Sequence, residues 1–163
     1  MNWAFTLGRI ALVAMFIFSG AGKLLDIAGT AAQISAKIPI PMFLDDLVIQ
    51  VEAAVGMPRY QIIAIAVGVV EVLGGLLIVF NVLTRTAAVV LLIYTAVATV
   101  YFHDFWNMAG EVRQDNMISA LKNLSIMGAF LILAAIPRRI WLVEHDAGVD
   151  ERPVVVHESD MRP

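Results

Sequence analysis

The chain contains no cysteine among its 163 residues. This absence excludes structural disulfides, a Cys-ligated metal and any thiol–disulfide relay carried by this chain alone. Charged residues are also scarce, at 15% against the roughly 25% usual in soluble domains. No basic run is present, so we expect no nucleic-acid partner. Because 60% of the residues are hydrophobic, we predict a membrane protein that has the lipid bilayer as its first partner.

Four long apolar runs account for most of this hydrophobicity. They cover about residues 3–22, 61–83, 86–105 and 117–136, and each has about the 20 residues that a transmembrane helix needs. Backbone groups in lipid must be hydrogen-bonded within the segment, so each run is predicted to be a helix. The first run also fits a signal peptide, with Arg9 before residues 10–18 and small residues at 19–21. We expect it to be retained as a span.

The first connection, residues 23–60, is long and contains Pro39 and Pro41, which interrupt any helix there. Apolar residues then recur at helical spacing over about residues 42–56, with acidic residues between them. This stretch is too short and too charged to span a bilayer, so we predict an amphipathic helix on the membrane face. The expected fold class is therefore an all-α membrane protein, a four-transmembrane-helix bundle with an amphipathic extracytoplasmic helix between helices 1 and 2.

The charged residues suggest how the chain is divided and oriented. We expect a membrane domain at residues 1–139 and a polar C-terminal tail at residues 140–163, where charges gather. Lys and Arg near the span ends show a slight bias that favours cytoplasmic N- and C-termini. The chain is thus predicted to be a multi-pass protein of a bacterial inner (plasma) membrane.

Three of the runs carry an isolated ionisable residue. Glu71 lies near the middle of the second run, where a carboxylate costs about 2.5–3.5 kcal/mol or more on insertion scales. Three other ionisable residues reach the same depth as Glu71 if neighbouring helices are antiparallel. They are His103, Lys122, and Lys23 at the end of the first run. Ionisable residues inside a membrane point to function by default. The alternative is that Glu71 pairs with Lys122 or Lys23 and only holds the helices in register.

The predicted cluster suits a small apolar ligand better than a haem or a metal ion. A bis-His haem needs two histidines on facing helices, but His145 and His157 lie in the tail. A metal site from His103, Asp104 and Glu71 lacks a motif. A quinone-like ligand needs an apolar slot, hydrogen-bond partners and a protonatable group. The candidate catalytic residues are Glu71, His103 and Lys122, and the candidate ligand-binding residues are Ser19, Lys23, Phe102, Phe105, Trp106 and Asn123.

Six segments carry a resemblance to a known family. They are LGRIAL at residues 7–12, FSGAGKL at 18–24, EVLGGLL at 71–77, LTR at 83–85, FHDFW at 102–106 and LKNL at 121–124. Together they resemble the DoxX family of small four-helix membrane proteins, over about residues 7–136. Some members of that family look like subunits of membrane oxidoreductase assemblies, including quinone-linked ones, and the resemblance implies such a redox link here.

Three functions are therefore open. The first is a redox-linked protein that binds a quinone-like or other small apolar ligand in the polar cluster. The second is a non-catalytic accessory or assembly subunit of a larger membrane oxidoreductase complex, with partner subunits or as a homo-oligomer. The third is a small proton or anion transporter, and the observation that supports it is the position of Glu71 within a span.

Overall fold

The computed structural model describes residues 3–136, in which every regular element is helical. Four helices are long and apolar enough to cross a membrane: α1 (Trp3–Leu25), α4 (Arg59–Val79), α5 (Thr84–Phe102) and α6 (Gly110–Ala135). No strand occurs within these residues, so the predicted all-α membrane protein with four spans is confirmed. The polar tail predicted at residues 140–163 lies outside the described residues, and the division of the chain at residue 139 stays a prediction.

The two largest differences from the predicted spans, at the end of α4 and at the start of α6, have local reasons. α4 ends at Val79 instead of about residue 83, because Asn81 and Leu83 adopt left-handed conformations with φ of 59° and 48°. Such angles are uncommon outside glycine and stop a helix. α6 begins at Gly110 and not at about residue 117, since polar residues continue the helix before the apolar run starts. A short 3-10 helix, η2 (Phe105–Asn107), connects α5 to α6.

α1 and α4 form a close pair whose backbones approach at glycines. A Cβ atom added to Gly20 would lie 2.7 Å from the carbonyl oxygen of Gly68, too close for any side chain. Gly74 of α4 leaves the same kind of space for Leu91 of α5, where an added Cβ would lie 3.0 Å from the leucine side chain. Small residues let membrane helices gain dispersion contacts by close approach.

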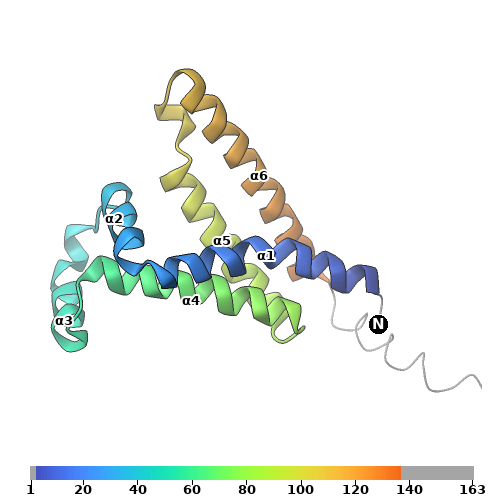
Figure 1. Ribbon diagram of the computed structural model, residues 1–163, viewed down its shortest axis with the longest axis horizontal. Helices are drawn as coiled ribbons and strands as arrows, with labels where there is room; N and C mark the ends of the chain where they lie inside the picture. The colour runs from blue at the N-terminus through green and yellow to red at the C-terminus, as the bar shows by residue number, and fades with distance from the viewer. Residues whose placement is uncertain (1–2, 137–163) are drawn as a thin grey trace, which may run out of the picture.

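The apolar core lies where the four spans come together. Its fully buried members include Val13 of α1, Ile78 of α4, Leu91 of α5 and Phe130 of α6. Away from this core, α5 and α6 lean away from α1 and α4, so that the two pairs form a V (Figure 1). The structure therefore holds the helices together at one end and separates them at the other.

A helix that the sequence pattern did not predict, α2 (Ile27–Lys37), follows α1 directly. Asp26 caps it, because its Oδ1 accepts a hydrogen bond of 2.9 Å from the backbone N–H of Gly29. Ala31 and Ile34 are buried in a small cluster with Ala64 of α4. An isolated helix of this length is marginal in water, so the packing against α4 stabilises it.

The amphipathic helix predicted at about residues 42–56 is present as η1 (Met42–Leu44) and α3 (Asp45–Val55). Neither element has a buried residue, and the side chains of Met42 and Phe43 are 88% and 82% exposed. α3 lies across the end of α4 in Figure 1. This geometry suits a helix on a membrane surface, while the side of the membrane on which it lies stays a prediction.

Arg59, at the start of α4, links α3 to the spans through hydrogen bonds and ion pairs. Its guanidinium donates to Glu52 Oε2 at 3.1 Å and to Asp45 Oδ1 at 3.3 Å. The hydrogen bonds from Arg59 hold the pKa of Glu52 below its ordinary value, so this carboxylate is ionised at neutral pH. The attachment is thus electrostatic and polar, in contrast to the apolar contacts that hold α2.

Candidate functional site

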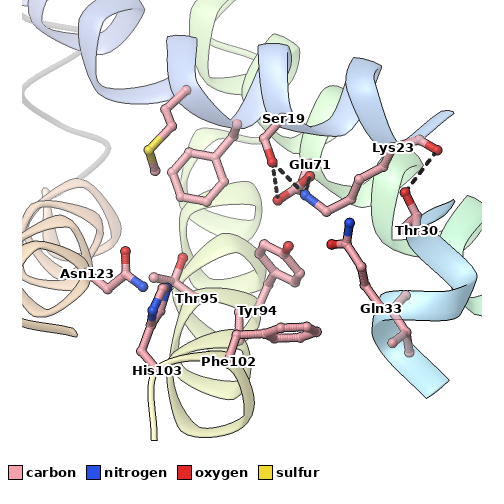
Figure 2. A pocket seen from close by; sticks show the side chains of 14 residues that line it. Ser19, Lys23, Thr30, Gln33, Glu71, Tyr94, Thr95, Phe102, His103 and Asn123 are labelled. Carbon is pink, nitrogen blue, oxygen red and sulfur yellow. Dashed lines mark hydrogen bonds and ion pairs between the residues drawn. The ribbon is translucent and has the colours of Figure 1, made fainter. Parts of the chain in front are cut away.

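A pocket of about 320 Å³ lies between the two helix pairs, and all four spans and α2 contribute to it (Figure 2). This volume is at the lower end of the range for small-molecule sites, about 300–1,000 Å³. More of the lining residues are polar than apolar. The polar set is Ser19, Lys23, Thr30, Gln33, Glu71, Tyr94, Thr95, His103 and Asn123, and the apolar set is Met15, Phe16, Ile34, Ala98 and Phe102.

Glu71 is buried at one wall of this pocket, with 3% of the residue exposed. Its Oε2 accepts a hydrogen bond of 2.8 Å from Lys23 Nζ, and Ser19 Oγ donates to its Oε1 at 3.4 Å. Ser19 and Lys23 are four residues apart and so share one face of α1. Gly20 between them lets that face come close to α4. Tyr94 of α5 also interacts with the Glu71 carboxylate, so this mid-span acid is surrounded by polar partners.

The opposite wall comes from the end of α5 and from α6. His103 Nδ1 lies 3.1 Å from Asn116 Oδ1, a distance at which a protonated Nδ1 donates a hydrogen bond. Asn123 Nδ2 donates to Thr99 Oγ1 at 2.9 Å, which ties α6 to α5 beside the pocket. Phe102 adds an aromatic side chain to this wall. The wall therefore combines an imidazole, an amide and a ring.

α2 is linked to this wall by a charged contact. Lys37, in the last turn of α2, has its Nζ 3.7 Å from Oδ1 of Asp104, which follows His103. The pair is long and partly exposed, so it contributes little to stability. The pair places α2 beside the end of α5, where Phe102 and His103 line the pocket.

Three of the four ionisable residues expected to converge do so. Lys23, Glu71 and His103 all line the pocket. Lys122 does not join them, because its side chain is exposed and its neighbour Asn123 faces the pocket instead. Successive residues of an α-helix point about 100° apart, so one position decides which of the two faces inward. The ion-pair partner of Glu71 is Lys23, and not Lys122.

The predicted aromatic walls are partly rearranged. Phe102 lines the pocket, whereas Phe105 and Trp106 lie in η2 and pack edge-on against each other with ring centroids 5.2 Å apart. Phe16 and Tyr94 take their place, with a centroid separation of 6.4 Å. The roles assigned to all these residues stay predictions, but the geometry separates those at the pocket from those beyond it.

Several pocket residues were not predicted from the sequence. Tyr94 is one of them, although a phenol at mid-span is itself a signal, because its hydroxyl needs a partner away from water. Thr30 and Gln33 belong to α2, which the pattern did not identify. Nothing in the sequence around these two residues marks them as part of a site.

Within residues 3–136, no group of three or more His, Cys, Asp or Glu residues lies close enough to hold a metal ion. The alternative metal site from His103, Asp104 and Glu71 is therefore not assembled. His145 and His157 lie outside the described residues. Hydrogen-bonding groups and one partly buried ion pair line this pocket.

Comparison with known proteins gives the same affiliation as the motifs. The DoxX family profile matches residues 4–104. The chain is similar to inner membrane protein YphA of Escherichia coli (strain K12), 36% identical over 128 residues, which are 78% of this chain and 79% of the relative. It is also similar to inner membrane protein YqjF of the same organism, 34% identical over 126 residues, 77% of this chain and 78% of the relative. No solved structure matches.

The match spans more than half of the chain and includes Glu71, Lys23 and His103. It also covers the helices that contribute most of the pocket wall, α1, α2, α4 and α5. The chain therefore belongs to the DoxX family and is a four-span membrane protein.

Proposed function

We propose that this DoxX protein resides in a bacterial inner (plasma) membrane and binds a small redox-active amphiphile of the quinone type between its two helix pairs. One observation carries the proposal: a single cavity of about 320 Å³ combines a partly buried ion pair, aromatic side chains and further hydrogen-bonding groups. The four apolar helices and the names of both relatives support the location.

The two walls fit a flat ring that carries carbonyl oxygens. Phe16, Tyr94 and Phe102 offer aromatic surfaces, against which rings pack edge-on or offset. The ammonium of Lys23 has three N–H groups, of which one is donated to Glu71 and one to Ser19. The third is available for a ligand carbonyl, and the Lys23 side chain is 26% exposed. A carbonyl in this position would meet a charged donor, which makes the stronger kind of hydrogen bond.

Proton exchange is the second part of the proposal. Reduction of a quinone to a quinol takes two electrons and two protons. Glu71 and His103 flank the cavity and are the residue types that most often give and accept protons in catalysis. We assign the electron supply to a partner oxidoreductase, because a chain without cysteine has no thiol couple of its own.

The test is a binding measurement on the purified full-length protein in lipid nanodiscs. We expect organic extracts of the wild type to contain quinone, and added decyl-benzoquinone to bind and to raise the thermal unfolding midpoint. Glu71→Gln removes the charge that orients Lys23, so the ligand carbonyl loses its charged hydrogen bond to Lys23, which is worth about 1.5–3 kcal/mol. The dissociation constant should therefore rise roughly tenfold or more.

Lys122→Gln is the matched control. It also removes one charge from a span, but Lys122 is exposed and lies outside the pocket, so its dissociation constant should equal that of the wild type. Absence of quinone from the extracts, together with no binding of the added compound by wild-type protein, would contradict the proposed function.

A second candidate, an accessory subunit of a membrane oxidoreductase, is favoured by the exposed apolar side chains of η1 and α3. Leu47 and Val55 are 58% and 53% exposed in addition to Met42 and Phe43. The same titration separates the two functions. A non-catalytic subunit would show no quinone binding, and Glu71→Gln would then affect only its stability or assembly.

A further inference from the structure

Met15 is exposed although it belongs to the pocket wall. It lines the pocket, and 52% of its surface is accessible. At about 1.5 Å per residue, Met15 lies about 18 Å along α1 from Trp3, which is near the middle of this 23-residue span. The outside of a span at this depth is hydrocarbon and not water. The pocket therefore reaches the bilayer core beside Met15.

The other edge of this opening is α6. α1 and α6 meet where the rings of Phe16 and Phe130 lie 5.3 Å apart between centroids. From Phe130 back toward Gly110, α6 runs away from α1 (Figure 1). Asn123, near the middle of α6, faces the pocket across from Ser19 and Glu71 (Figure 2). The opening thus lies between α1 and α6, beside this contact, with Met15 and Asn123 on its two sides.

Asn123, at the opening, is polar, but the charged Lys23 and the polar side chains of α2 lie away from Met15 in the same cavity. Lys23 lies two turns beyond Met15 along α1, and Gln33 and Thr30 of α2 lie beside it (Figure 2). A ligand in this pocket would find hydrogen-bond partners at the α2 end and lipid at the Met15 end. A cavity of about 320 Å³ holds a ring-sized head but has no room for a long chain as well.

From the position of Lys23 and the opening beside Met15 we propose that the ligand is a tailed amphiphile taken sideways from the bilayer. Its polar head lies against Lys23 and Gln33, and its hydrocarbon tail leaves past Met15 between α1 and α6. The inference rests on the proposed function and adds to it the substrate class, a lipid-dissolved molecule with one apolar chain, and the direction of access.

The test compares two ligands with one head. A benzoquinone without a side chain and the same ring bearing a decyl chain are titrated into wild-type protein in nanodiscs, with affinities expressed per mole of lipid-dissolved ligand. The decyl compound should bind at least tenfold more tightly. Met15→Trp fills the opening and should weaken decyl binding at least tenfold, by a clearly larger factor than it weakens binding of the chainless ring.

Leu7→Trp is the matched control, because Leu7 is on the same helix and 55% exposed but does not line the pocket. It should leave both affinities unchanged. A decyl quinone with a diazirine at the chain end gives a readout that does not depend on the folding of a variant. In the wild type it should crosslink to Met15 or to neighbouring residues of α6.

The outcomes separate the inference from the proposed function. Equal affinity for the two rings, no effect of Met15→Trp, or crosslinks confined to α2 and α3 would each overturn sideways access while the quinone site still stands. If neither compound binds to the wild type, the proposed function fails and the inference fails with it.

Discussion

At the scale of single residues, the pair of Glu71 and Lys23 shows how a charge is accommodated at mid-span. Lys23 and Ser19 both donate to the carboxylate of Glu71. A buried ion pair is not in itself strongly stabilising, because desolvation offsets much of the attraction. The Glu71 side chain is 4% exposed but that of Lys23 is 26% exposed, on the pocket side. The pair therefore has a second use, as the preorganised polar end of a binding site.

We expect Lys23→Met to destabilise the protein more than the double variant Lys23→Met/Glu71→Leu. The single change leaves a buried carboxylate without its cation, which costs about 3–5 kcal/mol, whereas apolar replacement of both partners is often close to neutral. Chemical unfolding in detergent gives the coupling free energy from the double-mutant cycle. The same cycle with Lys122 should give none, because Lys122 is exposed. Equal coupling of Glu71 to both lysines would contradict this assignment.

Lys122 and Asn123 show which part of the site could be predicted from the sequence. Counting residues along a hydrophobic run gives the depth of a side chain, and both residues lie at the expected depth. It does not give the rotation of a helix about its axis, which depends on packing with α5 and on contacts such as Asn123 with Thr99. The depth of the cluster and several of its members were therefore predictable, but the outward position of Lys122 was not.

At the scale of helices, the same distinction separates α1, α4, α5 and α6 from α2. The four spans are each specified by a local run of apolar residues, so composition alone predicts them. α2 is specified by a cap at Asp26 and by burial of Ala31 and Ile34 against Ala64. The cap is a local contact, but the burial links residues far apart in the chain, so the apolar pattern of residues 27–37 does not by itself predict the helix.

The contact between α1 and α4 can be tested with one methyl group. Gly20→Ala would place a Cβ atom 2.7 Å from Gly68 O and 2.8 Å from Glu71 Cβ. The helices must separate, and overpacking of this kind costs about 1–3 kcal/mol. We expect a lower thermal unfolding midpoint in detergent and weaker quinone binding, because Glu71 and Ser19 are pushed apart.

Gly22→Ala, two residues further along α1, is the control. A Cβ atom there meets nothing within 4 Å, and alanine favours a helix over glycine by about 1 kcal/mol. Its stability should equal or exceed that of the wild type. A loss as large as that of Gly20→Ala would show that close packing with α4 is not what Gly20 provides.

At the scale of the whole molecule, the V of two helix pairs gives the protein a closed end and an open end. The apolar core closes one end, while Lys23, His103 and α2 lie toward the open end. The slight bias of Lys and Arg predicts that the open end faces away from the cytoplasm. If so, the head of a bound amphiphile is held near the outer surface, and protons exchanged by His103 come from that side.

The absence of cysteine makes this orientation directly measurable. Gln50→Cys in α3 and Asn107→Cys in η2 lie at the open end, and Val82→Cys lies in the turn between α4 and α5; all three positions are exposed. With cytoplasmic termini, a membrane-impermeant maleimide should label the first two in intact cells and Val82→Cys only after lysis. The wild type, having no thiol, supplies the blank. Labelling of Val82→Cys alone in intact cells would reverse the orientation, and would place the polar end of the pocket, and its proton exchange, on the cytoplasmic side.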